Sequence, residues 1–234
     1  MSQKLWEANL SNKNKSNLFK FEKFISKKYG YKARKNYKKL FNWSIKNSKL
    51  FWSSVWDFTN VKGSKTEKFK FTKEFIKNKF FVKSKLNFAE NLLANNNNSK
   101  AITFISETGY REVRSWRELH KNTSKLINFY RQNKILAKDR IAAYMVNQIE
   151  TVECFLAAST IGAIWSSCSP DFGTEGLIER FSQIRPKILI ITDRYYYNGK
   201  EINILKRLPF ILKKIKSIKT VLIVNYPGKK YLKY

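Results

Sequence analysis

From about residue 140 to residue 224, short apolar runs alternate with segments of helical periodicity. Apolar residues spaced i, i+3, i+4 predict helices at 148–161, 174–184 and 202–215, whereas short apolar runs predict strands at 141–146, 163–167, 187–192 and 220–224. Strands that alternate with helices in this way indicate βαβ units around a parallel sheet. Ligands of such sheets bind beyond the carboxyl ends of the strands, so the loops to inspect are Asn147, 169–173, 193–199 and 225–228.

A hairpin and a capped helix are expected just before this region. The apolar run 101–105, the turn at 107–109 and the alternating segment 110–114 have the pattern of two antiparallel strands. Ser115 and Glu118 then match a capping box, in which each side chain accepts a hydrogen bond from a backbone N–H at the start of a helix.

The first 95 residues have the pattern of helical pieces joined by polar, Lys-rich connections. Apolar residues recur at helical spacing over 18–25 before Gly30, and a second, aromatic-rich face covers 50–58; both are interpreted as packing surfaces. The asparagine run at 95–98 is the strongest polar break. We therefore expect a helical N-terminal extension over 1–95 and an α/β domain over 96–234.

Composition adds a strong positive charge, because 47 Lys and Arg residues against 17 Asp and Glu residues give +30. Such a charge makes nucleic acid or an anionic membrane the first partners to consider. The excess lies on the flanks: residues 1–100 carry +18 and 201–234 carry +8, whereas 101–200 carry only +4. Lys outnumbers Arg by 37 to 10, although nucleic-acid grooves favour Arg. We interpret the excess as solvated surface lysine; the alternative is a basic nucleic-acid-binding protein with a steep salt dependence and its lysines on one face.

Several classes of protein are disfavoured. The longest apolar stretch, 154–165, is too short for a membrane span, and residues 1–7 lack the apolar run of a secretory signal. Cys154 and Cys168 make neither a disulfide framework nor a zinc site, and a single histidine, His120, disfavours a Ser-His-Asp triad or a metal cluster. We expect a cytoplasmic protein.

The most unusual segment is WSSCSPDFG at 165–173, which follows an expected strand and precedes an expected helix. Its small hydroxyl residues would let a ligand approach the backbone, Thr174 could cap the helix, and a helix N-terminus favours an anion. An ordinary strand-to-helix turn has much the same composition. The sequence contains no Gly-rich dinucleotide motif, Walker loop, zinc-protease motif or nucleophile elbow, so residue chemistry alone predicts a cytosolic α/β domain.

Longer motifs resemble those of one enzyme family. The segment LNFAENLL at 86–93 is similar to the opening signature of acyl-CoA synthetases close to acetyl-CoA synthetase. The segment GAIWSSCSPDFG at 162–173 is specific to a smaller group, because it resembles the acetoacetyl-CoA synthetases, or acetoacetate–CoA ligases. The same family is indicated by RFSQIRPK at 180–187, YNGK at 197–200, VWDF at 55–58, FW at 51–52 and LWE at 5–7, although Ala8 stands where the family usually has Pro.

This resemblance implies a ligase of the adenylate-forming superfamily that uses ATP, Mg²⁺ and CoA. In such enzymes the carboxylate of the acid attacks the α-phosphate of ATP and releases pyrophosphate, and the CoA thiol then displaces AMP from the acyl-adenylate. The implied fold is α/β: a helical N-terminal extension followed by the first part of the mostly parallel βαβ sheet layer of the large domain.

The family's Ser/Thr/Gly-rich phosphate loop and C-terminal catalytic lysine do not occur in these 234 residues. We therefore expect the N-terminal part of such an enzyme, with an incomplete AMP-dependent synthetase/ligase domain over 96–234 and no activity by itself. A non-catalytic remnant or assembly module is the remaining alternative.

The resemblance also implies which residues contact CoA. Ser169, Pro170 and Asp171 match the turn that touches the CoA nucleotide in acetyl-CoA synthetases, and Tyr197 and Lys200 match basic residues that face its 3′-phosphate. Because Tyr197 replaces one base, Lys200 would be the single cation retained, a point charge suited to phosphate. A solvent-facing lysine is an equally good interpretation. No catalytic residue or metal ligand is expected here, and the expected partners are CoA and acetoacetate or a related short acid.

Overall fold

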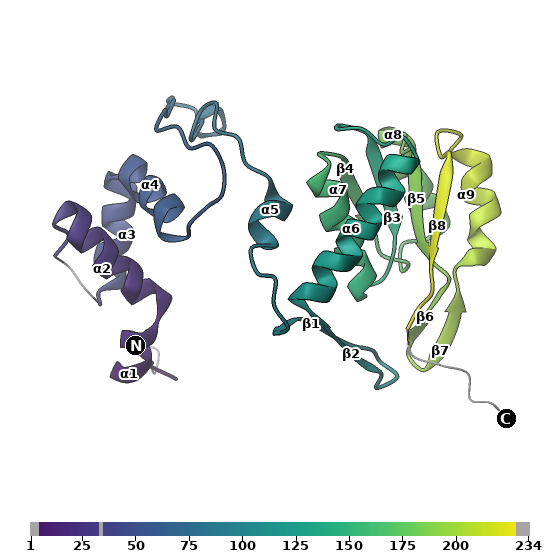
Figure 1. The fold of residues 1–234 in the computed structure, drawn as a ribbon, viewed down its shortest axis with the longest axis horizontal. Helices are drawn as coiled ribbons and strands as arrows, with labels where there is room; N and C mark the ends of the chain where they lie inside the picture. The colour runs from purple at the N-terminus through teal and green to yellow at the C-terminus, as the bar shows by residue number, and fades with distance from the viewer. Residues whose placement is uncertain (1–4, 33–34, 228–234) are drawn as a thin grey trace. The chain divides into compact units, whose positions relative to one another are not determined.

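The computed structural model describes residues 5–32 and 35–227 (Figure 1). Contacts along the chain divide it into two compact units, Met1–Leu86 and Asn87–Tyr234. The asparagine-rich break at 95–98, where the sequence places the boundary between an extension and an α/β domain, lies inside the second unit. Gly228, the last residue of one expected loop, lies outside the described residues.

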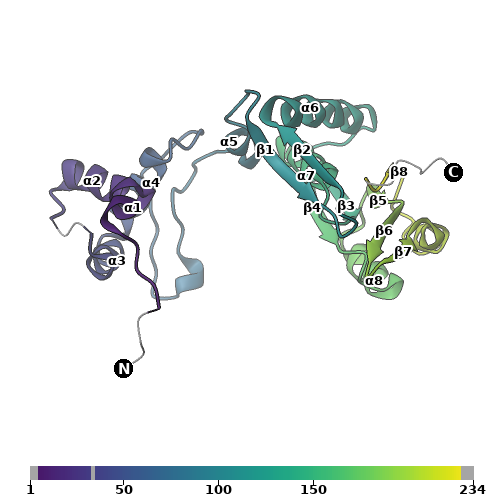
Figure 2. The same cartoon turned by 90° about the horizontal axis from the view of Figure 1, so that it is seen from below.

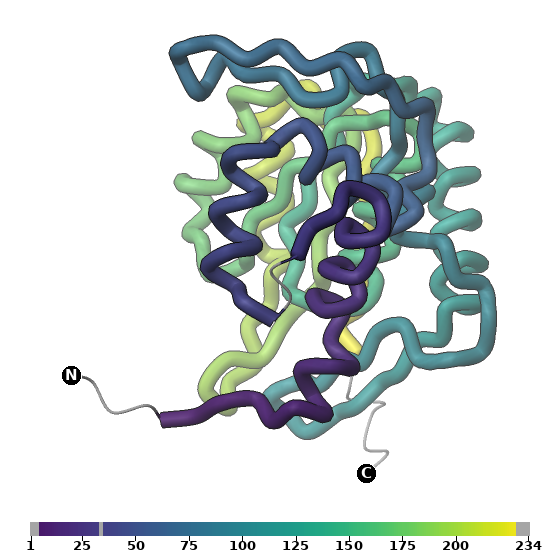
Figure 3. Tube along the Cα trace, turned by 90° about the vertical axis from the view of Figure 1, so that its left-hand side faces the viewer, coloured from purple at the N-terminus to yellow at the C-terminus, as the bar shows by residue number. Residues whose placement is uncertain are grey.

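The first unit is helical. Its elements, purple and blue in Figure 3, are α1 (Leu10–Lys15), α2 (Asn17–Tyr29), α3 (Tyr37–Lys46), α4 (Ser48–Phe58) and the 3-10 turn η1 (Phe75–Lys77). Side chains that accept a backbone N–H begin the first three helices: Asn9, Ser16 and Asn36. Gly30 ends α2 with a φ of 69°, in the left-handed region that glycine enters without strain.

Aromatic side chains fill the centre of this unit. Phe21 of α2 packs edge-on against Phe51 and Phe58 of α4, with ring centroids 5.7 and 5.3 Å apart. Ile25, Tyr31 and Leu40 complete the buried centre among the described residues. The apolar faces that the sequence predicts at 18–25 and 50–58 are therefore confirmed as packing surfaces, except that Leu18 and Leu50 at their starts are exposed.

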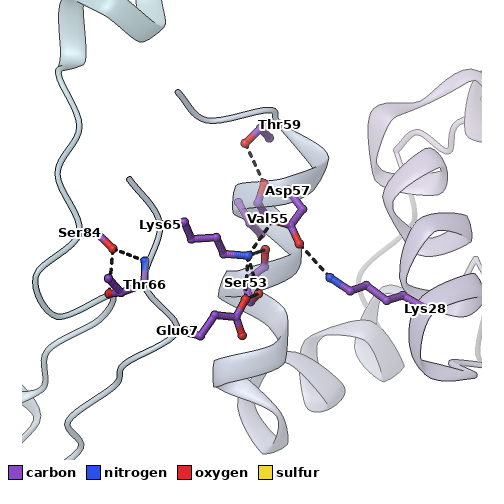
Figure 4. A network of polar contacts seen from close by, with 9 residues as sticks. All are labelled: Lys28, Ser53, Val55, Asp57, Thr59, Lys65, Thr66, Glu67 and Ser84. Carbon is purple, nitrogen blue, oxygen red and sulfur yellow. Dashed lines mark hydrogen bonds and ion pairs between the residues drawn. The ribbon is translucent and has the colours of Figure 1, made fainter. Parts of the chain in front are cut away.

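A network of charges joins α4 to its neighbours (Figure 4). Asp57 of α4 forms ion pairs with Lys65 at 2.7 Å and with Lys28 of α2 at 2.8 Å. Lys65 also lies 2.9 Å from a carboxylate oxygen of Glu67 and donates a hydrogen bond to the Ser53 hydroxyl at 2.8 Å. Because cations from two directions share one carboxylate, Asp57 fastens both α2 and the coil at 65–67 to α4.

The same contacts shift the acidity of the two carboxyl groups. Burial acts to raise the pKa of Asp57, but hydrogen bonds from Lys28 and Lys65 outweigh it, so the pKa lies below its ordinary value. The Ser53 hydroxyl and the Lys65 ammonium lower the pKa of Glu67. Both carboxyl groups therefore bind a proton less tightly in the folded chain than in the unfolded chain.

The second unit begins with α5 (Phe88–Leu92), the antiparallel hairpin β1 (Lys100–Ile105) and β2 (Arg111–Ser115), and α6 (Trp116–Gln132). At the start of α6 the Ser115 hydroxyl accepts the Glu118 N–H at 3.3 Å, and the Glu118 carboxylate accepts the Ser115 N–H at 2.8 Å. The expected hairpin and capping box are confirmed.

A parallel sheet forms the centre of the second unit. Among the described residues its order is β4-β3-β5-β8, made of β3 (Arg140–Tyr144), β4 (Ile164–Cys168), β5 (Ile188–Thr192) and β8 (Thr220–Val224). The connecting helices include α7 (Ile149–Thr160), α8 (Thr174–Ile184) and α9 (Leu208–Lys214). The α/β fold with a mostly parallel sheet is therefore confirmed.

Helices cover both faces of this sheet (Figure 2). Ile141 and Ala143 of β3 pack in a cluster with residues of α6 and α7, whereas Ala142 and Tyr144 pack in a cluster with residues of α8 and α9. This alternation follows from the two-residue period of a strand, which sends successive side chains to opposite faces.

The region between β5 and α9 differs from the expectation of one helix at 202–215. It contains a second hairpin, β6 (Arg194–Tyr197) and β7 (Lys200–Asn203), then the 3-10 turn η2 (Leu205–Arg207), and only afterwards α9. Asn198 and Gly199 have φ of 51° and 73°, as a two-residue hairpin turn requires. Pro209 lies in the first turn of α9, where its missing N–H is tolerated, but a longer helix would place it in the interior.

The expected cap of α8 is also wrong. Thr174 is the first residue of the helix, and Gly173 occupies the cap position without a side-chain hydrogen bond. No helix among the residues that the structure describes is long and apolar enough to cross a membrane.

Replacing Asp57 with asparagine leaves Lys28 and Lys65 without their shared carboxylate. We expect Asp57→Asn to lower the opening free energy of α2 and α4 by about 1–2 kcal/mol, because the ion pairs are partly shielded from water. Native-state hydrogen exchange of peptides from α2 and α4 measures this energy. Glu74→Gln is the matched control: Glu74 and Lys77 form a surface pair in which both side chains are 62% exposed, and its loss should matter by less than about 0.5 kcal/mol. Equal effects of the two substitutions would contradict the proposed role of Asp57.

The lowered pKa of Asp57 also predicts how this unit responds to acid. Its contribution to stability is complete above the unfolded pKa, near 4, and is lost as the pH falls through the lower folded value. Below about pH 5 the wild-type unit should therefore lose stability more steeply than Asp57→Asn, as measured by the same exchange experiment across pH. Parallel pH profiles would show that another group is responsible.

Candidate functional site

A cavity of about 240 Å³ lies at the carboxyl ends of the parallel strands. Its walls come from the end of β3, the start of α7, the end of β4 and the turn that follows β4. The lining residues are Met145, Val146, Asn147, Thr151, Ser167, Cys168, Ser169 and Asp171. Two of the loops that the sequence selects, Asn147 and 169–173, therefore meet at one cavity.

The turn at 169–172 is shaped by its own hydrogen bonds. The Ser169 hydroxyl donates to Oδ2 of Asp171 at 2.8 Å, and the Phe172 N–H donates to the Ser169 carbonyl at 3.1 Å. Ser169 and Asp171 are exposed, whereas Pro170 is buried. A ligand in the cavity would thus meet the side chains of Ser169 and Asp171, and Pro170 would act through the shape of the turn.

Three side chains from other elements anchor this turn. The hydroxyl of Tyr144, at the end of β3, lies 3.1 and 2.8 Å from the carbonyl oxygens of Pro170 and Phe172. Arg207 of η2 donates to the Pro170 carbonyl at 3.0 Å and also to the Tyr144 hydroxyl. Tyr195 of β6 donates to Oδ1 of Asp171 at 3.0 Å. The sheet core and the second hairpin therefore both hold the turn.

Burial determines the protonation of these groups. It raises the pKa of Tyr144 against the opposing effect of Arg207, and burial together with the hydrogen bond to Asp171 raises the pKa of Tyr195. Both phenols are therefore donors at neutral pH. Burial also raises the pKa of the Cys168 thiol, although Arg180 opposes the shift, so this cysteine is not activated as a nucleophile.

Tyr197 and Lys200 lie directly opposite each other at the end of the second hairpin. Opposed residues of an antiparallel pair point to the same face, and Tyr195 shares that face because it is two positions from Tyr197. Tyr197 is 63% exposed, and Lys200 is exposed without a carboxylate partner in the part of the chain that the structure describes. The face that reaches Asp171 through Tyr195 therefore also presents Tyr197 and Lys200.

Other contacts hold the second hairpin in place. The Gly199 N–H donates to Oε1 of Glu107 in the β1–β2 turn at 2.6 Å, so the tips of the two hairpins meet (Figure 1). Asp193, which directly follows β5, accepts the backbone N–H of Tyr226 at 2.6 Å and forms an ion pair with Arg194 at 2.6 Å. The loops expected after β5 and β8 are joined by this aspartate.

Sequence reasoning missed the anchoring residues Tyr144, Tyr195, Arg207 and Glu107. The Asn198-Gly199 pair is a strong hairpin signal and would have revealed the strand that carries Tyr195. Tyr144 could have been selected by its position at the end of an expected strand. Arg207 has no local signal, because its partner Pro170 lies 37 residues away.

The side chains at the carboxyl ends of the strands are suited to binding a polar ligand. They offer hydroxyl groups, the exposed carboxylates of Asp171 and Glu107 and the exposed ammonium of Lys200, which suit a ligand that carries both hydroxyl and phosphate groups. Within residues 5–32 and 35–227, no group of three or more His, Cys, Asp or Glu side chains could hold a metal ion.

Comparison with known proteins identifies similar sequences. The family model described as AMP-binding enzyme matches residues 90–232. The acetoacetyl-coenzyme A synthetase of Rhizobium meliloti (strain 1021) is 35% identical over 225 residues, which cover 96% of this chain and 34% of that protein. The acetoacetyl-CoA synthetase of Gallus gallus is 34% identical over 230 residues, with the same coverage of 96% and 34%. The chain thus spans about a third of the length of these relatives.

The fold has a counterpart among solved structures. The acetoacetyl-CoA synthetase from Streptomyces lividans superposes with a TM-score of 0.89 over 99% of this chain and 36% of that chain, at 24% sequence identity. Both units of the chain therefore have the fold of the corresponding part of that protein.

Removing the Tyr144 hydroxyl should loosen the turn without disturbing the sheet. We expect Tyr144→Phe to speed the amide exchange of residues 169–173 by roughly tenfold, because about 1–2 kcal/mol of hydrogen bonding is lost there. Hydrogen exchange of peptides covering the turn and β5 provides the measurement. Tyr110→Phe is the control, since it removes a hydroxyl bonded to Glu112 in the first hairpin and should leave the turn unchanged. Unaltered exchange at 169–173 in Tyr144→Phe would refute the anchoring role.

Proposed function

The chain belongs to the AMP-binding enzyme family, and we propose that it forms the CoA-nucleotide side of an acetoacetate–CoA ligase. The complete reaction converts acetoacetate, ATP and CoA into acetoacetyl-CoA, AMP and pyrophosphate. The similarity to acetoacetyl-CoA synthetases over 96% of this chain supports the choice of reaction. We place the enzyme in the cytoplasm.

The observation that carries the proposed role is the exposed turn at 169–171 held beside the face of the second hairpin. Lys200 is an exposed cation suited to the 3′-phosphate of CoA, and Asp171 keeps lone pairs that a ribose hydroxyl can donate to. Tyr195 connects the two, because its hydroxyl is bonded to Asp171 and its strand carries Tyr197. These groups fit the nucleotide end of CoA, and the residues we assign to it are Ser169, Pro170, Asp171, Tyr197 and Lys200.

The other substrates are assigned less directly. Enzymes of this family use ATP, Mg²⁺ and CoA, and of these we assign only CoA to residues of this chain. We propose that the 234 residues alone do not activate the acid, because their sequence has no loop similar to the family's Ser/Thr/Gly-rich phosphate loop. No residue here is assigned to the acyl group, so the proposal covers acetoacetate or a related short acid.

A test of the phosphate contact compares two ligands and two lysines. We expect Lys200→Gln to weaken CoA binding by about three- to tenfold, because an exposed charge-assisted contact is lost. Binding of dephospho-CoA, which lacks the 3′-phosphate, should not change. Ligand-observed NMR titration of the purified chain detects even weak binding of both ligands.

Lys206→Gln is the matched control for this experiment. Lys206 is an exposed lysine in the turn that follows the second hairpin, so its loss changes the net charge by the same amount nearby. A similar loss of CoA affinity in Lys206→Gln would indicate a general field effect. Equal weakening of CoA and dephospho-CoA by Lys200→Gln would exclude the assigned phosphate contact.

Tyr197 stands where the family has a basic residue, so restoring a basic residue there should increase the affinity for CoA. Tyr197→Arg adds a second cation directly opposite Lys200. We expect about three- to tenfold tighter binding of CoA and no gain for dephospho-CoA, because arginine can bind a phosphate with two parallel hydrogen bonds. Tyr197→Gln, which adds no charge, should show no such gain, and a gain in that variant would contradict the explanation.

A further inference from the structure

A second cavity, of about 550 Å³, lies where the parallel strands begin. Arg140 is the first residue of β3, while Lys187 and Lys219 directly precede β5 and β8. The ends of α8 and α9 and the loop after α9 complete the wall, with Ser182, Arg185, Lys214, Ile215, Lys216 and Ser217. Parallel strands begin and end at opposite edges of a sheet, so this cavity is separate from the proposed CoA site.

Cations dominate the lining, and few of them are neutralised. Among the described residues the ion pair of Lys187 with Asp139, at 2.7 Å, is the only one that involves a lining residue. Arg140 donates to the carbonyl oxygens of Ile184 and Arg185 at the end of α8, at 2.9 and 3.2 Å. These bonds fix the guanidinium of Arg140 at the wall of the cavity without cancelling its charge.

Among the described residues, five of the six lining cations have no acidic partner. Arg185, Lys216 and Lys219 are exposed, and within the described part of the chain none of them pairs with a carboxylate. They come from two segments, the cap of α8 and the loop 215–219 between α9 and β8. Because the fold holds them around one concavity, these cations repel one another, and a bound anion would reduce this unfavourable electrostatic energy.

The ends of the two helices explain only part of this charge. Each helix end contributes about half a negative charge, which favours Arg185 and Lys214 at those positions. The six cations less Asp139 and these two helix ends still leave about +4 around the cavity. The surplus therefore exceeds what capping of the helices requires.

One residue of the lining has a buried hydroxyl group without a hydrogen-bond partner among the described residues. The side-chain oxygen of Ser217 is shielded from solvent and has no hydrogen-bond partner within residues 5–32 and 35–227, although Ser217 lines the cavity. A buried hydroxyl that makes no hydrogen bond is unfavourable. Because this oxygen has almost no exposed surface, a ligand in the cavity does not reach it, and the case for an anion rests on the cations.

We propose that this cavity binds a compact oligophosphate, either an inorganic phosphate chain or the phosphates of a nucleotide. Its volume lies within the roughly 300–1,000 Å³ of small-molecule sites. Ile215 is the only apolar side chain of the nine that line it, which disfavours an apolar ligand. The cations come from separate segments around a hollow, a geometry that suits a small multivalent anion better than the long backbone of a nucleic acid.

The test uses inorganic triphosphate as the probe and two charge-matched variants. Arg185→Gln, Lys216→Gln and Lys219→Gln are combined in the site variant. Arg117→Gln, Lys121→Gln and Lys125→Gln are combined in the control, because these residues are exposed on α6 and remove the same three charges. By isothermal titration calorimetry at low salt, we expect triphosphate to bind at least tenfold more weakly to the site variant and within about twofold of wild type to the control.

Several outcomes would overturn the proposal. One is that wild type does not bind triphosphate, and another is that the two variants weaken binding equally. If circular dichroism shows that the site variant has not folded, the single variant Lys219→Gln replaces it, and wild-type affinity in that variant would also overturn the proposal. Duplex DNA that binds more tightly than triphosphate and depends on the same three cations would instead identify a nucleic-acid surface.

A parallel titration with ATP identifies the source of the phosphates. Equal affinities for ATP and triphosphate would show recognition of the phosphate chain alone, and tighter binding of ATP would identify a nucleotide. Either result supports the site only if the site variant binds that ligand more weakly than wild type does. The ratio of CoA to dephospho-CoA affinity should be the same in the site variant as in wild type. Failure of the proposed CoA contact can therefore be distinguished from failure of this site.

Discussion

The structure of the second unit depends on the burial of β3 and β5 from both sides. Every residue of β5 and all but the first residue of β3 are buried. A strand buried on both faces needs helices on both faces, and crossovers of one hand bring each new strand back parallel to the last. The four strands of this sheet therefore begin at one edge and end at the other. This constraint separates the polar groups into two places, with hydroxyls and Asp171 beyond the strand ends and unpaired cations before the strand starts.

Tyr144 shows how this core and the candidate site are coupled. Its ring belongs to the buried cluster beneath α8 and α9, while its hydroxyl contacts the turn at 169–172. Arg207 bonds to both the hydroxyl and the turn, so the segment between the second hairpin and α9 is joined to the same point. The exposed positions of Ser169 and Asp171 are therefore set by Tyr144, which is buried, and Arg207, which is half-buried. A change in packing beneath the turn would therefore move Ser169 and Asp171 without replacing either residue.

Local patterns predicted the regular parts of this fold and failed where distant residues decide the structure. The helix at 174–184 and the strand at 220–224 have the predicted bounds, because continuous periodicity and clear breaks define them. The segment 202–215 contains apolar residues at helical spacing, yet Asn198-Gly199 and Pro209 divide it into a hairpin, a turn and a short helix. The sequence placed residues of the candidate CoA site only through family resemblance. The bond from Tyr195 that connects the turn to the hairpin depends on the order of the folded elements and has no signature in the sequence.

The positions of the cations in space also depend on the fold and cannot be predicted from local sequence patterns. Counted along the sequence, residues 101–200 carry only +4, and the basic run LKKIKSIK at 212–219 supplies three of the six cations of the cavity. Arg140, Arg185 and Lys219 are far apart in the chain, and the parallel sheet brings them together because each lies at or near the start of a strand. A net charge therefore says little about an anion site, since the same number of lysines on exposed helices is individually solvated. What distinguishes the amino edge of the sheet is the convergence of cations around a cavity with a single paired carboxylate, and this property arises from topology.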